Sequence, residues 1–327
     1  MSNNHFNKFE SAVWGFIIGD AMGVPFEFSD REELSKYPVT DMVGFGTHFQ
    51  PVGTWSDDTS MMLCVLEYLC EEGEQTKDYW VFKSLLQQKK LATKFLDWYK
   101  NGAYTASGEI FDIGITTQTA LEAFSKGTKA SECGVLNVAV GCGNGSLMRT
   151  LPIAYFFRED KVSLRNLIGT RIGKITHRTI LTSVCISFYN EFFFSLLNGD
   201  TKLDALKHAQ SAIAYIIRHT DGLVEDKSIK LLTRMMQKNF GLLKSDEIKS
   251  GGYVIETLEA AIWSFLNTKS FSEAVLTAIN LGGDTDTIGA LTGGLAGCYY
   301  QDGIPEVWKD KIQNKVLIES ILAKVPR

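Results

Sequence analysis

Two short acidic segments, one near each end of the chain, contain the residues best suited to chemistry. The first is Trp55–Thr59, which reads WSDDT, and the second is Gly282–Thr287, which reads GGDTDT. Each leads into an apolar stretch with helical spacing. Four carboxylates with Ser and Thr hydroxyls form an all-oxygen ligand set, which suits Mg²⁺ or Mn²⁺ and does not suit Zn²⁺ or copper. We therefore predict one shared metal site in a metal-dependent enzyme.

Helix capping is the alternative explanation of the same residues. Asp, Ser and Thr are common at helix N-termini, where they accept backbone N–H bonds and complement the helix dipole. One such residue per helix suffices for a cap, whereas Asp57 and Asp58 are adjacent and Asp284 and Asp286 are two apart. Like charges packed this closely repel, and a bound dication relieves the repulsion. The occurrence of two such clusters favours metal binding over capping.

A glycine-rich loop lies between the acidic segments. It spans Gly141–Ser146, reads GCGNGS and is followed closely by Arg149. Loops of this kind present backbone N–H groups to phosphate oxygens. The loop lacks the Gly-Lys-Ser/Thr ending of a nucleotide-triphosphate loop, so a plain tight turn explains it equally well. Arg149 could clamp an anion or form an internal ion pair.

Two single residues are further candidates. Glu27 lies between Phe26 and Phe28, where a raised pKa would suit an acid, a base or a substrate sensor. A solvent-facing loop glutamate is the equally weighted alternative. His177 stands at an expected helix start, where a structural or capping histidine is commoner than a catalytic one.

Composition and charge restrict the class of protein. The chain has 327 residues, of which 45% are hydrophobic and 22% charged, as in ordinary soluble globular proteins. The formal net charge of -5 argues against a general nucleic-acid binder, which needs a basic face. We expect no nucleic-acid partner and a monomer.

The cysteines and the N-terminus indicate a cytoplasmic protein. The six cysteines are scattered without a Cys-x-x-Cys pair, as expected for buried reduced thiols. The first residues lack the pattern of a secretory signal, and apolar runs such as Phe192–Leu197 are too short to span a bilayer. We predict a soluble, cytoplasmic protein with no membrane partner, and leave secretion by a signal-less route open.

The segments that must position the candidate site residues show mainly helical spacing of apolar residues. Apolar residues recur near i, i+3, i+4 and i+7 in Phe9–Ile18, Thr59–Glu71, Ala92–Tyr99, Thr116–Phe124, Ser163–Ile175, Thr179–Leu197, Lys202–Arg218, Tyr253–Leu266, Phe271–Asn280 and Thr287–Tyr300. No comparable series of alternating strands occurs. We predict an all-α fold of about a dozen helices in one compact domain over residues 1–327.

Two further patterns concern packing. The polar stretch Asp221–Ser250 has the weakest periodicity and is interpreted as a mobile insertion. Gly289, Gly293 and Gly297 recur every four residues, a spacing that lets another backbone approach closely. We expect dense central packing behind the metal site.

Six motifs in one order resemble the ADP-ribosylglycohydrolase family, which includes the dinitrogenase-reductase-activating glycohydrolase and the ADP-ribosylarginine and ADP-ribosylserine hydrolases. These motifs are Gly19–Gly23 with Glu27, Trp55–Thr59, Phe111–Thr117, Gly143–Arg149, Thr176-His177 and Gly282–Thr287. They extend over most of the chain, within about residues 15–300.

The resemblance implies an all-α fold with a central dinuclear metal site of two Mg²⁺ or Mn²⁺ ions. It also implies hydrolysis of the glycosidic bond that joins ADP-ribose to an acceptor. By position in the motifs, Ser56, Asp57, Asp58 and Asp286 would hold one ion, and Asp284, Asp286 and Thr287 the other, with Asp286 bridging. Asp286 is therefore expected to be the most critical ligand.

The remaining motifs imply contacts with the substrate. Glu27 matches a glutamate on a mobile flap, Asp112 matches an acidic residue near the substrate ribose, and the loop residues Gly143, Asn144, Gly145 and Ser146 would face the pyrophosphate. The family usually continues after its Thr-His pair with Pro or a second polar residue. Here Arg178-Thr179 follows, which leaves the substrate role of His177 open.

The implied mechanism uses a metal-activated water. Metal ions can orient the ribose hydroxyls and lower the pKa of a bound water. A carboxylate must then take a proton or stabilise oxocarbenium-like charge, and the candidates are Asp57, Asp58, Glu27 and Asp112. The sequence does not say which of them is the base.

The expected partner is an ADP-ribosylated protein, with ADP-ribose as product. Arginine is the expected acceptor, because Phe111–Gly114 resembles the segment of arginine-directed relatives and an acidic cleft attracts a guanidinium. Serine and other ADP-ribose conjugates stay open.

Two other classes of protein fit parts of the same pattern. All-α isoprenoid synthases also bind Mg²⁺ through aspartate-rich helices, but their motif has a further acid where this chain has Ser60–Met62. An inactive family member with a structural or ADP-ribose-binding role is the second alternative, and the presence of all four aspartates counts against it.

Overall fold

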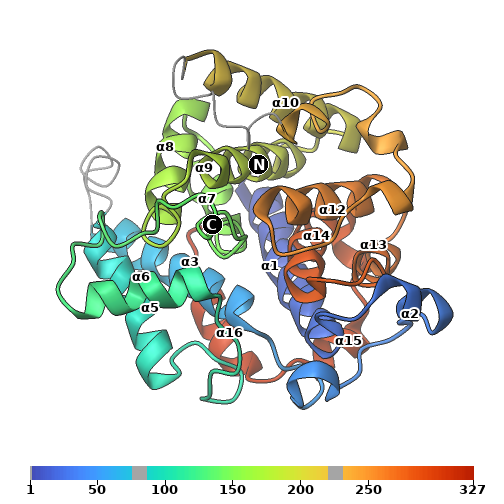
Figure 1. The fold of residues 1–327 in the computed structure, drawn as a ribbon, viewed down its shortest axis with the longest axis horizontal. Helices are drawn as coiled ribbons and strands as arrows, with labels where there is room; N and C mark the ends of the chain where they lie inside the picture. Colours follow the sequence, from blue (N-terminus) through green and yellow to red (C-terminus); the bar gives the residue numbers. More distant parts are fainter. Residues whose placement is uncertain (1, 76–86, 220–230) are drawn as a thin grey trace.

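The computed structural model describes residues 2–75, 87–219 and 231–327, and helices dominate it (Figure 1). They are α1 (Ser2–Gly23), α2 (Arg31–Lys36), α3 (Asp57–Gln75), α5 (Gln88–Asn101), α6 (Ile115–Ser125), α7 (Leu151–Phe156), α8 (Val162–Gly173), α9 (Ile180–Leu197), α10 (Lys202–His219), α12 (Val254–Leu266), α13 (Phe271–Ile279), α14 (Thr285–Tyr300), α15 (Glu306–Lys311) and α16 (Lys315–Leu322).

Short 3-10 turns and isolated bridges complete the fold. The turns are η1 (Val24–Phe26), η2 (Gly46–His48), η3 (Leu231–Thr233), η4 (Phe240–Leu242), η5 (Ser245–Glu247) and η6 (Gln301–Gly303). Within the described ranges there is no β-strand, only isolated bridges such as Gly143 with Tyr253. The predicted all-α class, in one compact domain, is confirmed.

The centre of the molecule is the pair α1 and α14, which lie side by side (Figure 1). Glycines form the contact: a Cβ on Gly289 would lie 2.5 Å from the carbonyl oxygen of Gly19, and one on Gly293 would lie 2.1 Å from that of Gly15. Only glycine allows two backbones to approach this closely. The close approach predicted from the glycine spacing is confirmed, and it brings the start of α14 beside the end of α1.

Helix α3 carries the first acidic segment between two apolar clusters. Its Met62, Leu63 and Leu66 side chains belong to the cluster built around α1, α9 and α14. Met61 and Val65, on other faces of α3, belong to a second cluster with α5 and α6. Because α3 is buried on several sides, its N-terminal carboxylates are held at a fixed position.

Helix α9 corrects one expectation from the sequence. The apolar run Phe192–Leu197 is not an isolated short run but the end of an 18-residue helix that, by length and composition, could cross a membrane. No other helix in the described ranges has this property. In the structure 83% of α9 is buried against its neighbours, which include α8, α10 and α12, and this burial accounts for its apolar composition.

Helix boundaries differ from the predicted ones at the two acidic segments. We expected helices from Thr59 and Thr287, but α3 begins at Asp57 and α14 at Thr285. Asp and Thr are favourable in a first helical turn because they complement exposed N–H groups. Helices α2, α7, α15 and α16 were not predicted because six to eight residues are too few for a clear period.

The segment interpreted as a mobile insertion packs against the rest of the fold in the part that the structure describes. Residues 221–230 lie outside the described ranges. Between 231 and 250 the chain forms three 3-10 turns and buries Leu232, Met235, Phe240 and Ile248. Arg234 forms an ion pair with Glu259 of α12, which fixes this segment further. All six cysteines are buried and none forms a disulfide, as expected.

Candidate active site

A cleft of about 330 Å³ brings most of the predicted site residues together. Those that line it are Glu27, Asp57, Asp112, Gly143, Asn144, Gly145, His177, Asp284, Asp286 and Thr287. Ser56, Asp58 and Ser146 are buried and do not line it. Residues from six separate segments therefore meet in one place.

Asp20, which we did not predict as a site residue, caps α3 from the neighbouring helix α1. Its carboxylate accepts hydrogen bonds from the backbone N–H of Ser56 and of Thr59, each at 3.0 Å. Burial raises the pKa of Asp20 to about 6. Because Asp20 satisfies these amides, Asp57 and Asp58 are not needed as caps. The only sequence signal for Asp20 was its place in the Gly19–Gly23 motif.

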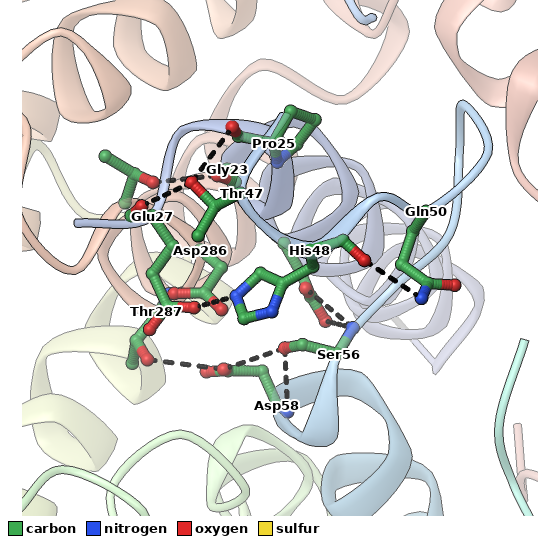
Figure 2. A network of polar contacts seen from close by, with 12 residues as sticks. Gly23, Pro25, Glu27, Thr47, His48, Gln50, Ser56, Asp58, Asp286 and Thr287 are labelled. Atoms are coloured by element: carbon green, nitrogen blue, oxygen red, sulfur yellow. Dashed lines mark hydrogen bonds and ion pairs between the residues drawn. The ribbon is translucent and has the colours of Figure 1, made fainter. Parts of the chain in front are cut away.

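The two acidic segments meet at Asp58. Its Oδ2 atom accepts hydrogen bonds from Ser56 Oγ at 3.1 Å and from Thr287 Oγ1 at 3.2 Å (Figure 2). Its Oδ1 atom is buried and has no hydrogen-bond partner among the residues described. A carboxylate oxygen in that position is available to a cation.

The second acidic segment presents a similar arrangement. Asp284 accepts a hydrogen bond from Asn144 Nδ2 at 2.8 Å through Oδ2, while its Oδ1 atom is buried without a partner in the described part of the chain. Asp286 accepts one from the amide of Thr287 at 2.9 Å. Oxygens of Glu27, Asp284 and Asp286 lie within 4.8 Å of one another. Three acidic side chains can thus reach one ion.

The electrostatics of the cleft favour a bound cation. Burial raises the pKa of Asp57, Asp58, Asp284 and Asp286, and neighbouring carboxylates add to the effect. Buried like charges are costly unless they are protonated or bind a counter-ion. With two unpaired carboxylate oxygens and an all-oxygen donor set, the residues present fit a hard divalent cation.

Glu27 is held by a second loop that the sequence did not reveal. Its carboxylate contacts the Nε2 atom of His48, and its carbonyl oxygen accepts from Thr47 Oγ1 at 2.7 Å (Figure 2). The ring of His48 lies 5.3 Å from that of Phe111, measured between centroids. Burial raises the pKa of Glu27 to about 7, although the bond from His48 acts in the opposite direction. No motif or spacing marked His48 beforehand.

The glycine-rich loop contributes Gly143, Asn144 and Gly145 to the lining of the cleft. Asn144 donates its amide to Gly252 and accepts from the amide of Leu147, which closes a turn. The amides of Gly145 and Ser146 donate to none of the acceptors in the described residues. Ser146 differs from the expectation in one respect, because its side chain is fully buried behind the loop.

Arg149 is neither an anion clamp nor half of an ion pair. It is fully buried, and no carboxylate within the described ranges pairs with it. Its guanidinium instead donates to the carbonyl oxygens of Gly145, at 3.1 Å, and Ile172, at 3.0 Å. Both roles considered from the sequence are therefore wrong, and Arg149 supports the loop from behind.

His177 lies at the cleft, next to the glycine-rich loop. Burial, with the nearby charge of Arg149, lowers its pKa to about 3, so the imidazole is neutral at physiological pH. Its Nδ1 atom is 2.8 Å from Thr176 Oγ1.

Comparison with known proteins decides the family. The sequence profile described as ADP-ribosylglycohydrolase matches residues 1–326. The chain belongs to the ADP-ribosylglycohydrolase family. The resemblance seen in the six motifs is thereby confirmed, and the isoprenoid-synthase alternative loses its support.

Relatives within the ADP-ribosylglycohydrolase family align over nearly the whole chain. ADP-ribosylarginine hydrolase Tri1 of Serratia proteamaculans (strain 568) is 33% identical over 319 residues, covering 96% of this chain and 78% of the relative. The ADP-ribosylarginine hydrolase Tri1 of Pseudomonas putida (strain GB-1) is 31% identical over 319 residues, covering 94% of this chain and 74% of the relative. A solved structure of an ADP-ribosylglycohydrolase-related protein complex is similar with a TM-score of 0.76 and 27% identity, over 98% of both chains.

This membership makes the chain a hydrolase of a family that is generally metal-dependent. The buried acidic cluster of Glu27, Asp284 and Asp286 agrees with that dependence.

Proposed function

We propose that this protein hydrolyses the glycosidic bond between ADP-ribose and protein arginine, and so releases ADP-ribose from the modified protein. The observation that carries the proposal is the single cleft in which the two acidic segments, Glu27, Asp112 and the glycine-rich loop meet. The names of two relatives above 30% identity, both ADP-ribosylarginine hydrolases, support arginine as the acceptor.

The proposal includes two Mg²⁺ or Mn²⁺ ions. Ser56, Asp57, Asp58 and Asp286 would hold one ion, and Asp284, Asp286 and Thr287 the other. The unpaired buried oxygens of Asp58 and Asp284 and the raised pKa values around them support this assignment. When bound, the ions would orient the ribose hydroxyls and lower the pKa of a water near the anomeric carbon.

Proton transfer is assigned to Glu27. A carboxyl group with a pKa of about 7 can both hold and release a proton near neutral pH. The contact with His48 fixes its side chain, and its position within reach of Asp284 and Asp286 places it at the acidic end of the cleft. Asp57, kept anionic by the ion that it would hold, would face the positive charge that develops on the ribose.

The other cleft residues bind and orient the substrate in this proposal. The free amides of the glycine-rich loop suit the pyrophosphate oxygens. Asp112, half-buried at the cleft, suits the guanidinium or the attached ribose. The described lining contains five carboxylates and neither Lys nor Arg, so its field attracts a cationic acceptor more than a neutral seryl oxygen.

The direct test supplies the purified full chain and Mg²⁺ with arginine-linked and serine-linked ADP-ribosyl peptides side by side, and measures released ADP-ribose. We expect faster release from the arginine linkage. Equal or faster release from the serine linkage would overturn the acceptor assignment. No release from either, with ADP-ribose still bound, would identify an inactive ADP-ribose-binding member. A cytoplasmic location and a monomeric state stay predictions.

A further inference from the structure

Arg149 is a buried cation, and none of its described partners carries a negative charge. Its Nη2 atom donates to Thr176 Oγ1 at 2.8 Å, besides its bonds to backbone carbonyls. The ring of Phe95 lies 4.6 Å from the guanidinium carbon. A buried charge needs such partners in place of its hydration. The residue is therefore rigidly placed behind the cleft wall.

The bond to Thr176 determines where the hydroxyl proton of Thr176 goes. A guanidinium can only donate, so Thr176 Oγ1 must be the acceptor in this bond. The hydroxyl has one proton of its own, and Thr176 is fully buried. The other hydrogen-bond neighbour of Oγ1 among the described residues is His177 Nδ1, at 2.8 Å. The hydroxyl therefore donates to Nδ1, which must carry a lone pair and no proton.

This assignment settles the tautomer of His177. A neutral imidazole that accepts at Nδ1 has its proton on Nε2. The Nε2 atom is next to the glycine-rich loop, since a Cβ on Gly143 would lie 3.5 Å from it and one on Gly145 would lie 3.6 Å from it. Both glycines and His177 line the cleft. The low pKa of His177 keeps the ring neutral, so the tautomer persists at physiological pH.

We propose that Arg149 and Thr176 are positioning residues that hold His177 as its Nε2–H tautomer, so that His177 donates a hydrogen bond to a phosphate oxygen of ADP-ribose. The opposite tautomer would present a lone pair to an anion, which is repulsive. The charge of Arg149 behind the loop also favours an anion at this place. The identity of the ligand rests on the proposed function, whereas the tautomer does not.

The test compares Thr176→Val, which lacks the hydroxyl, with Thr176→Ser, which keeps it. Histidine labelled with nitrogen-15 reports the tautomers by NMR, and His177→Gln assigns the signals among the five histidines. In the wild type and in Thr176→Ser we expect an Nε2–H ring with a hydrogen-bonded Nδ1. In Thr176→Val we expect loss of the Nδ1 hydrogen bond and a detectable population of the other tautomer.

Calorimetric titration of the Mg²⁺-loaded full chain with ADP-ribose gives the second readout. Thr176→Val should bind about 10-fold more weakly, and Thr176→Ser should bind like the wild type. Protonated Nδ1 in the wild type, or unchanged affinity in folded Thr176→Val, would overturn the proposal. The wild-type spectrum decides the tautomer even if Thr176→Val does not fold. Failure of the wild type to bind ADP-ribose would instead overturn the proposed function and the phosphate contact, with the tautomer still decided by NMR.

Discussion

At the scale of single residues, Asp286 is the side chain on which we expect activity to depend most. It lies in the first turn of α14 beside Asp284, with Glu27 within reach. We expect Asp286→Asn to lower kcat/KM for ADP-ribose release by about 100-fold or more, because one carboxylate would serve both ions. Circular dichroism should show an unchanged helical fold. The exposed Asp302→Asn is the matched control. Near-normal turnover of Asp286→Asn would rule out the shared-ligand assignment.

A second single-residue change, at Asp112, tests whether arginine is the acceptor. This residue lines the cleft, and no metal-ligand role is assigned to it. We expect Asp112→Asn to reduce hydrolysis of arginine-linked peptide strongly and to leave Mg²⁺ affinity unchanged, because the substitution removes a charge that faces the guanidinium. Kinetics and metal titration check the two parts. If the arginine reaction were indifferent to the substitution, Asp112 would have no part in recognising the acceptor.

At the scale of elements, the contact between α1 and α14 sets the position of the second acidic segment. A Cβ on Gly293 would lie 2.1 Å from the carbonyl oxygen of Gly15. We expect Gly293→Ala to destabilise the fold by about 1–3 kcal/mol, because the helices must separate, although alanine is the better helix former. Denaturant unfolding measures the change. Gly303→Ala is the control, since its Cβ would meet only the Cβ of Tyr300, at 3.5 Å.

At the scale of the whole molecule, the buried carboxylates make stability depend on pH. The folded-state pKa values of Asp20, about 6, and Glu27, about 7, exceed their ordinary values of 3.8 and 4.5. Between pH about 4 and 7 the folded chain therefore binds more protons than the unfolded chain, and its stability falls as pH rises. His177, with its lowered pKa, acts in the opposite direction, but six buried carboxylates with raised pKa values outweigh it. Melting temperatures of the chelated protein across this window test the sign, and a rise with pH would contradict it.

Metal binding should counteract the fall in folding stability as pH rises. Because a cation binds the ionised carboxylates of the folded chain, Mg²⁺ or Mn²⁺ should raise the melting temperature, and more so at pH 7 than at pH 5. Chelation should stop hydrolysis, and Mg²⁺ or Mn²⁺ should restore it better than Zn²⁺. Scanning calorimetry and the release assay measure both effects. Undiminished activity after exhaustive chelation would contradict the metal site.

Much of this protein could be predicted from local sequence. Apolar periodicity located the long helices, because a helix shows its buried face every three or four residues. The types and order of the residues in Trp55–Thr59 and Gly282–Thr287 indicated oxygen ligands and the family. The glycine spacing in α14 predicted a close backbone neighbour, although not that the neighbour would be α1.

The remaining features depend on contacts between segments far apart in the chain. Asp20 caps α3, His48 meets Glu27, Ser146 turns behind its loop, and Arg149 finds carbonyls instead of a carboxylate. None of these has a spacing or composition that distinguishes it, because a side chain acquires such a partner only when helices pack. Burial then decides the charge states as well, because an aspartate that has an ordinary pKa in water has a raised pKa inside the cleft.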